Sequence, residues 1–371
     1  MTNAVITAQQ GSTQADVGFK NRVINGDFRI NQRFGTALQT GITGGANYWL
    51  ADRFRIGGSA LSTGRFSFQT VTDAPAGFVN SGKITVTTSQ TPAASDVQVL
   101  SQIIEGINVS DFAWGTSGAL AVSLSFWVKA NLSGQYCVAV RSDNATAAYV
   151  ATYTITTANT WQYITISIPG CTFGTWGGQS LSTTIGVRLD FNLGTGTSSS
   201  TSSVNTWLTA DYFRTTSDIQ LVQTLGATWQ ITGVQLEVGT SASGFDYRFY
   251  GDELQRCYRY FVRMLAPGQE FYPMMMTGGY VFPSNYYKWI TRALPVPMRA
   301  SPTVTTYPDP NSTASPGQAR YFTTNSSGAG NNYVVYGTDS SPTTIKYAVY
   351  NEHNAITCYG SGCSFDASAE L

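Results

Sequence analysis

Residues able to carry out acid–base or nucleophilic chemistry are few in this chain. The only histidine is His353, beside Glu352 in a polar stretch. A Ser-His-Asp or Cys-His arrangement would have to use this one imidazole. No glycine-rich phosphate loop of the known spacings follows a strand pattern and precedes a helix pattern. The sequence therefore gives no indication of nucleophilic or nucleotide chemistry.

Paired carboxylates are the other common source of catalysis. Glycoside hydrolysis needs two of them within about 5–10 Å, and a β-fold could bring any two acids that close. Several acids here stand in turn-like contexts, as in Ser142-Asp-Asn144 and Pro308-Asp-Pro310, where an aspartate ordinarily caps its own backbone. Because no acid–base constellation stands out, we expect the protein not to be an enzyme.

Aromatic residues are the richer inventory, with 8 Trp, 21 Tyr and 19 Phe. Sugars stack their apolar faces on such rings while polar neighbours take the hydroxyls, although the same rings also suit an ordinary β-core. In the C-terminal part, Tyr286, Tyr287 and Trp289 follow a Met-rich cluster, among Gly, Pro, Ser and Asn. Such interleaving is typical of recognition loops, so these three are the predicted glycan-binding residues.

The strands are predicted by alternation of apolar and polar residues. It is clearest over 122–128, 162–168 and 185–193, and it places Phe126 and Phe191 on the core side. Trp127 and Trp161 stand on the opposite phase, facing solvent, a ligand or another subunit, and we prefer a subunit interface.

One short helix interrupts this pattern. Leu254, Cys257, Tyr258, Phe261 and Leu265 recur at helical spacing, after Asp252 and Glu253 in the first turn. The sequence predicts an all-β protein in four parts: an N-terminal arm (1–20), an antiparallel jelly-roll sandwich (21–250), a connecting helix (251–265) and a smaller C-terminal β-domain (266–371). The Gly/Ser/Thr-rich run 194–203 has the composition of a flexible excursion between two strands.

Composition narrows the class of partner. Charged residues are 11% of the chain and the formal net charge is zero, which argues against nucleic-acid or anionic-lipid binding. No window approaches about 18 apolar residues, and the N-terminus lacks signal-peptide blocks, so we expect neither membrane insertion nor general export.

The five cysteines, Cys137, Cys171, Cys257, Cys358 and Cys363, match no zinc spacing. Buried reduced thiols are the favoured interpretation, with a local Cys358–Cys363 disulfide as the alternative.

Several segments together resemble phage tail-fibre proteins whose body is similar to a carbohydrate-binding-module jelly roll. They span about residues 21–303 and occur in the family's order: Asn21-Arg-Val-Ile-Asn-Gly-Asp-Phe-Arg-Ile30, Tyr48-Trp-Leu-Ala-Asp-Arg-Phe54, Ser101-Gln-Ile-Ile-Glu-Gly106, Leu124-Ser-Phe-Trp-Val-Lys129, 227–264 and Leu294-Pro-Val-Pro-Met-Arg-Ala-Ser-Pro302. The resemblance implies a phage virion and a homotrimer.

The resemblance also raises the question of a structural calcium. In such modules the segment matching Asn25-Gly-Asp-Phe28 commonly holds one, with an acidic residue on the final strand. Here Arg29 stands where the family often has Glu, and Thr232-Gly-Val234 replaces the usual acidic pair. Asp27 and Glu237 are the candidate metal ligands that remain, and no other cofactor is expected.

The functional hypothesis is a non-enzymatic virion protein, made in the host cytoplasm and placed in a tail fibre or tail tip. The arm would bind other virion proteins, and the C-terminal domain would bind a host-surface glycan, with several copies compensating for weak single sites. One alternative is a head fibre or capsid decoration protein. Another is the carbohydrate-binding part of a glycan-degrading enzyme.

Overall fold

The computed structural model divides the chain into two compact units. Unit 1 comprises residues 1–253 and Leu371, and unit 2 comprises residues 254–370. The structure describes residues 20–43, 48–59, 65–143, 146–177, 183–264, 274–282, 286–307, 318–322, 332–351, 356–362 and 364–371. The predicted arm therefore lies outside the described residues, apart from Lys20.

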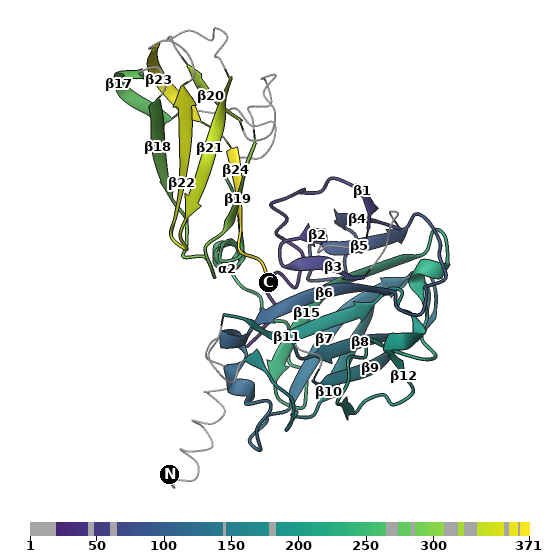
Figure 1. Ribbon diagram of the computed structural model, residues 1–371. Coiled ribbons are helices and arrows are strands. Elements are labelled where there is room, and N and C mark those ends of the chain that lie inside the picture. The colour runs from purple at the N-terminus through teal and green to yellow at the C-terminus, as the bar shows by residue number, and fades with distance from the viewer. Residues whose placement is uncertain are drawn as a thin grey trace. The chain divides into compact units, whose positions relative to one another are not determined.

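Unit 1 is a β-sandwich of two sheets (Figure 1). Sheet A has the spatial order β1 (Gln39–Ile42), β4 (Phe66–Val71), β5 (Ser81–Val86), β15 (Thr228–Val238), β7 (Val122–Ala130), β10 (Gln162–Ile168). Sheet B has the order β13 (Trp207–Leu208), β9 (Ala148–Ile155), β8 (Gly134–Arg141), β11 (Ile185–Asn192), β6 (Val97–Glu105), β3 (Phe54–Ser59), β2 (Tyr48–Ala51).

The connectivity is that of an antiparallel jelly roll, as predicted. Consecutive strands β5, β6, β7 and β8 alternate between the two sheets, and the late strands β11 and β15 insert between early ones. The pairs within sheets A and B are antiparallel. Most pairings therefore join residues far apart in the sequence.

Aromatic side chains join the two sheets in the core. Phe126 of β7 meets Tyr153 of β9 and Phe191 of β11, with ring centroids 5.1 and 5.2 Å apart. Phe191 also lies 5.7 Å from the ring of Trp229 in β15. Phe126 and Phe191 are fully buried, which confirms the core side predicted from alternation. Each such pair contributes about 0.5–1.5 kcal/mol beyond its buried area.

The segment 21–30 closes the sandwich by running beside β15. The Arg22 amide donates to the Leu236 carbonyl at 2.9 Å, and the Val234 amide donates to the Gly26 carbonyl at 3.0 Å. Phe28 then inserts its ring into the core, stacked on Phe54 with centroids 4.3 Å apart. This part of the segment is therefore structural.

Unit 2 contains two sheets with a core of their own. The first has the order β16 (Phe261–Met264), β24 (Ser364–Ser368), β19 (Thr303–Tyr307). The second has the order β17 (Met274–Phe282), β23 (Ile356–Gly362), β20 (Gln318–Phe322), β21 (Asn332–Ser340), β22 (Thr344–Asn351), β18 (Tyr286–Ala293). Its buried residues include Val262, Leu294, Met298, Ile345 and Phe365.

The helix is shorter than predicted. α2 covers Tyr250–Tyr258, and Phe261 belongs instead to β16, which pairs with β24. The run Tyr260-Phe-Val262 is rich in strand-forming residues, and pairing with β24 satisfies its backbone, so tertiary pairing overrides the helical spacing. Leu265 lies outside the described residues.

The cysteines that the structure describes agree with the prediction of reduced thiols. Cys137, Cys171 and Cys257 are buried thiols. The side chains of Cys358 and Cys363 lie outside the described part of the chain.

A substitution at Gly26 tests the closure by segment 21–30. A Cβ at this position would lie 2.2 Å from the Val234 carbonyl oxygen. Gly26→Ala should therefore lower the free energy of unfolding of unit 1 by about 1–3 kcal/mol. Gly251→Ala is the matched control, because a Cβ there meets nothing within 4 Å. Urea unfolding followed by tryptophan fluorescence measures both, and equal stabilities would refute the closure.

Candidate functional site

An open cleft of about 280 Å³ lies on the outer face of sheet B. We call it the sheet-B cleft. Its floor comes from β3, β6, β11 and β8, and one wall comes from the segment 197–215. The lining residues are Arg55, Gly57, Gly58, Val97, Val99, Ser101, Arg141, Arg188, Asp190, Ser199, Asp211 and Phe213.

Strand register places the polar side chains of the floor in rows. Ser101 of β6 pairs with Arg55 of β3 on one side and with Asp190 of β11 on the other. Arg188 of β11 pairs with Arg141 of β8. Because side chains alternate between faces, the inward Leu189 and Phe191 of β11 require Arg188 and Asp190 to point outward into the cleft.

An ionic network centred on the buried Arg141 and Asp190 lines the cleft. Arg141 donates from Nε to Asp190 Oδ2 at 2.8 Å and from Nη1 to Asp211. The Ser101 hydroxyl donates to Asp190 Oδ1 at 2.5 Å. Arg141 is only 6% exposed and Asp190 only 1%. Both oxygens of Asp190 are already acceptors, so its carboxylate is held in one orientation.

Phe213 supports this network from the wall. The guanidinium carbon of Arg141 lies 3.6 Å from the centroid of the Phe213 ring, in cation–π contact. Phe213 also packs with Val97 and Val99 in a small apolar cluster. The guanidinium is thus fixed between two carboxylates and an aromatic face.

A second buried network holds the wall itself in place. Asp218 accepts from Arg214 Nε and Gln220 Nε2, each at 2.9 Å, and from Asn192 Nδ2 at 2.7 Å. Burial raises the pKa of the Asp218 carboxyl, although the Cys137 thiol, Arg214 and Asn192 oppose the rise. Burial likewise raises the pKa of the Cys137 thiol, which keeps it protonated and unreactive.

The prediction of a flexible excursion over 194–203 is corrected by these contacts. Thr195 is fully buried, and its amide donates to Gln220 Oε1 at 2.7 Å. The short strand β12 (Ser200–Thr201) pairs in parallel with β14 (Arg214–Thr215). Composition alone misses this order because the fixing side chains, Arg214, Asp218 and Gln220, lie later in the sequence.

The rim of the cleft carries a weaker ion pair. Arg188 Nη2 lies 2.7 Å from Asp143 Oδ1, and the Asp143 side chain is 45% exposed. Exposed pairs of this kind contribute about 0–1 kcal/mol, so a ligand can replace Asp143 at little cost. The cleft thus offers fixed donors and acceptors at its floor and an exchangeable guanidinium at its rim, which suits a ligand with many hydroxyl groups.

A second hollow, of about 430 Å³, lies on the outer face of sheet A. We call it the sheet-A groove. Its lining residues are Ala76, Phe78, Ser125, Trp127, Tyr163, Gly233, Ala242, Ser243, Gly244, Phe245 and Tyr247. Trp127, predicted to face outward, is part of this lining.

Trp161, the other predicted outward tryptophan, is absent from the groove lining. Lys129 Nζ lies 5.1 Å from its ring centroid, and its indole nitrogen donates to Asp73 Oδ1 at 3.3 Å. The two tryptophans therefore have different surroundings.

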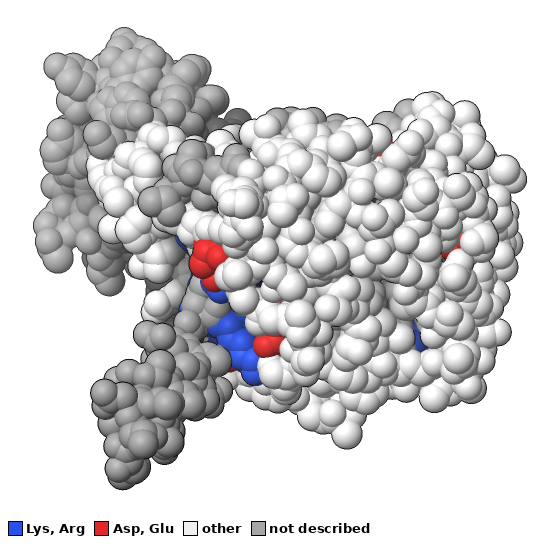
Figure 2. All heavy atoms as spheres, turned by 90° about the horizontal axis from the view of Figure 1, so that it is seen from below, with Lys and Arg blue, Asp and Glu red and all other residues white. Residues whose placement is uncertain are grey.

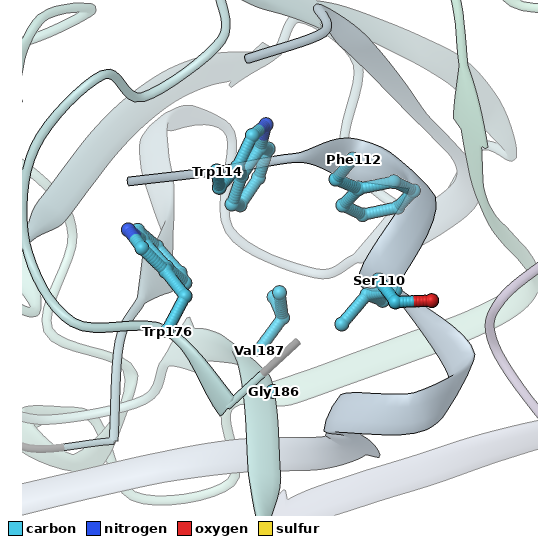
Figure 3. A pocket seen from close by; sticks show the side chains of 7 residues that line it. Ser110, Phe112, Trp114, Trp176, Gly186 and Val187 are labelled. Carbon is cyan, nitrogen blue, oxygen red and sulfur yellow. The ribbon is translucent and has the colours of Figure 1, made fainter. Parts of the chain in front are cut away.

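Trp114 and Trp176 are structural, being 3% exposed each. Figure 3 shows Trp114, Trp176 and Phe112 around a small pocket. Its volume of about 10 Å³ is barely sufficient for one water molecule. The indole nitrogens of Trp114 and Trp176 donate to carbonyls of Leu120 and Phe173, at 2.8 and 3.0 Å. This cluster packs one end of the sandwich and has no room for a sugar.

The candidate calcium ligands, Asp27 and Glu237, have protein partners that do not fit a metal. Asp27 pairs with Arg29, and burial raises the pKa of its carboxyl above the ordinary value. Glu237 accepts from the Ser243 amide and from Gln235 Nε2, each at 2.8 Å. Over the described part of the chain, no three His, Cys, Asp or Glu residues gather as metal ligands.

The predicted glycan-binding residues Tyr286, Tyr287 and Trp289 belong to β18, which pairs with β22. Their side chains are outside what the structure describes, and so is His353. The structure thus describes Trp127, Trp161, Asp27 and Glu237 but leaves the C-terminal prediction open.

Charge is sparse on the surface. On the face shown in Figure 2, charged side chains of both signs gather in one small area, and most of the described surface is uncharged. None of the described helices combines the length and the apolar character needed to cross a membrane.

Comparisons with known proteins give distant similarities to solved structures. No protein-family model matches the chain, and no curated protein sequence matches it. Solved structures that are similar include the enzymatically active domain of tailspike protein 4 of bacteriophage CBA120, at 12% identity and a TM-score of 0.30. That alignment covers 54% of this chain and 21% of the tailspike structure.

Two further structures align over most of their own length. A putative sugar-binding protein from Bacteroides thetaiotaomicron is 11% identical, covering 59% of this chain and 100% of that one, with a TM-score of 0.35. A family 11 carbohydrate-binding module of Clostridium thermocellum is 11% identical, covering 56% and 99%, with a TM-score of 0.25. At TM-scores this low, the assignment of the jelly roll depends on the strand order and pairing described above.

The Asp218 network predicts a pH dependence. Because burial raises the folded pKa above 3.8, the folded state holds this proton more tightly than the unfolded chain. The contribution of Asp218 to stability is thus fully present below pH 3.8 and decreases as the pH rises through the folded pKa. The unfolding free energy of the wild type minus that of Asp218→Asn should fall across this window in urea titrations. A difference that stays constant with pH would contradict it.

Proposed function

We propose that this chain is a non-enzymatic glycan-binding protein of a phage virion, placed in a tail fibre or tail tip, and that the sheet-B cleft contacts the host-surface glycan. The observation that supports binding is the buried Arg141–Asp190 pair at the floor of an open cleft. Burying two charges lowers stability unless every group is well paired. Such an arrangement beneath a solvent-filled hollow favours a polar ligand.

The chemistry of the cleft favours a polyhydroxylated ligand. Its charged lining residues are three arginines and two aspartates, so donors and acceptors are both present. Vicinal hydroxyls can bond in pairs to a guanidinium or a carboxylate. Fixed side chains also reduce the entropy lost on binding.

Binding without turnover is the proposal for this cleft. Asp190 accepts hydrogen bonds at both oxygens, and Asp211 pairs with the same Arg141. A general acid needs a carboxyl group that holds a proton and reaches the leaving oxygen. Because Ser101 and Arg141 already occupy these oxygens, positioning a ligand is the simpler role.

The virion assignment is supported by the sequence segments that resemble tail-fibre proteins. With it come the proposed homotrimer, the attachment of arm 1–20 to other virion proteins, and a contribution of Tyr286, Tyr287 and Trp289 to host contact. Several weak sites on one particle would raise the apparent affinity by orders of magnitude.

Substitution of Arg188 tests the cleft. Arg188→Ala removes a rim donor that pairs with the half-exposed Asp143, so folding should be preserved. We expect at least about tenfold weaker binding to purified host-surface polysaccharide, measured with the full chain by biolayer interferometry.

Lys129→Ala is the matched control, since Lys129 forms a similar exposed pair with Asp73 on the other sheet. Equal losses in both variants, or none in Arg188→Ala, would argue against the cleft. Loss only in a Tyr286→Ala, Tyr287→Ala and Trp289→Ala triple variant would place the contact in β18.

Labelling of virions tests the location. Gold-conjugated antibodies against the full chain should mark the tail fibres or the tail tip in negative-stain images. Labelling of the head would instead favour a head fibre or capsid decoration protein. Release of reducing sugar from host polysaccharide by the purified chain would favour the glycan-degrading alternative.

A further inference from the structure

The sheet-A groove has a chemistry different from that of the cleft. Its lining contains five aromatic residues and two serines, and none of its lining residues is charged. Its volume of about 430 Å³ lies within the range of small-ligand sites. The groove therefore suits an uncharged ligand with an apolar face and peripheral hydroxyl groups.

One wall is a pair of rings held by strand register. Trp127 of β7 lies directly opposite Tyr163 of β10 in the antiparallel ladder, and their centroids are 5.3 Å apart. Tyr163 is 44% exposed, which is high for an aromatic residue in the middle of a strand. Both rings belong to rigid elements, so a ligand would meet a preformed surface.

The other wall is a cluster of three rings. Phe78, Phe245 and Tyr247 contact one another with centroid distances of 5.0–5.6 Å. Tyr247 is 57% exposed. Two separate aromatic surfaces thus line one hollow, as stacking of more than one sugar ring requires.

Buried polar side chains of β15 fix this second wall. Gln235 Oε1 accepts from the Asp246 amide at 2.8 Å, and Glu237 Oε1 accepts from the Ser243 amide at 2.8 Å. Gln235 is fully buried and Glu237 is 5% exposed. The acidic residue predicted as a metal ligand therefore orders the loop that carries Phe245 and Tyr247.

Gly233 lets the cluster sit close to the sheet. Its φ is +62°, it lies in a bulge of β15, and a Cβ there would be 2.6 Å from the Phe78 ring. Any other residue would push Phe78 away from the strand. The bulge at Gly233 and the buried acceptors Gln235 and Glu237 thus hold the groove in one preformed shape.

We infer that the sheet-A groove is a second glycan-binding site, specific for neutral pyranose oligosaccharides. Pyranose rings stack on Trp127 and on the Phe78–Phe245–Tyr247 cluster, while Ser125 and the tyrosine hydroxyls are hydrogen-bond partners for the sugar hydroxyls. The site lies on the sheet opposite to the cleft, and its binding does not depend on the cleft.

A second copy of this chain is the competing occupant, because the sequence predicts Trp127 and Trp161 at a subunit interface. Substitutions of Trp127 and Trp161 distinguish a sugar from a second copy as the occupant of the groove. Trp161 is on the same sheet face but is covered by Lys129, so it should matter for an interface but not for a sugar in the groove.

The test uses the full chain and neutral di- to tetrasaccharides of glucose, galactose and mannose, titrated by calorimetry. We expect at least one sugar to bind with a Kd near millimolar, at least about tenfold weaker binding in Trp127→Ala, and recovery in Trp127→Phe. Trp161→Ala is the matched control and should bind as the wild type does.

Other outcomes overturn the inference. One is the absence of binding by any of these sugars at concentrations up to about 20-fold above the expected Kd. Another is an equal loss of affinity in Trp127→Ala and Trp161→Ala. A lower molecular mass of Trp127→Ala in analytical ultracentrifugation would assign the groove to a subunit interface. Arg188→Ala tests the sheet-B cleft separately from the sheet-A groove. It should weaken binding to host polysaccharide without changing the affinity for the neutral sugar.

Discussion

The contact of Phe126 with Phe191 across the sandwich determines what both outer faces can present. Side chains on a strand alternate strictly, so burying Phe126 of β7 forces Ser125 and Trp127 outward. Burying Phe191 of β11 forces Asp190 outward in the same way. A slip of one residue in either strand would exchange core and surface. The aromatic core therefore fixes the positions of the residues on both faces that can bind a ligand.

The two hollows are built on one plan with different chemistry. In each, a loop forms a wall over the outer face of a sheet, and a buried carboxylate holds that loop: Asp218 at the cleft and Glu237 at the groove. The cleft then presents charged groups that are paired with one another, whereas the groove presents rings and hydroxyls. Order in both walls comes from hydrogen bonds beneath them, so the binding surfaces need little reorganisation when a ligand arrives.

Sequence patterns predicted the sandwich, the buried phase of Phe126 and Phe191 and the outward phase of Trp127, because alternation records local geometry directly. They overestimated the length of the helix, because pairing of β16 with β24 places Phe261 in a strand. The cleft was missed because Arg55, Ser101, Arg141 and Asp190 come from four separate strands, and only tertiary register brings them together. One signal in the sequence pointed to the cleft. Arg188 and Asp190 are charged residues on the outward side of a predicted strand, in a chain of which only 11% of residues are charged.

The placement of the hollows on opposite sheets has a consequence for how a single protomer would engage a polysaccharide coat. Packed sheets are about 10 Å apart, and each hollow opens away from the other, so one short oligosaccharide cannot occupy both. If both hollows bind glycan as proposed, each sandwich would instead hold two separate polysaccharide chains apart. Such a protomer would cross-link those chains, and soluble copies should precipitate or gel a polymer that carries both kinds of sugar.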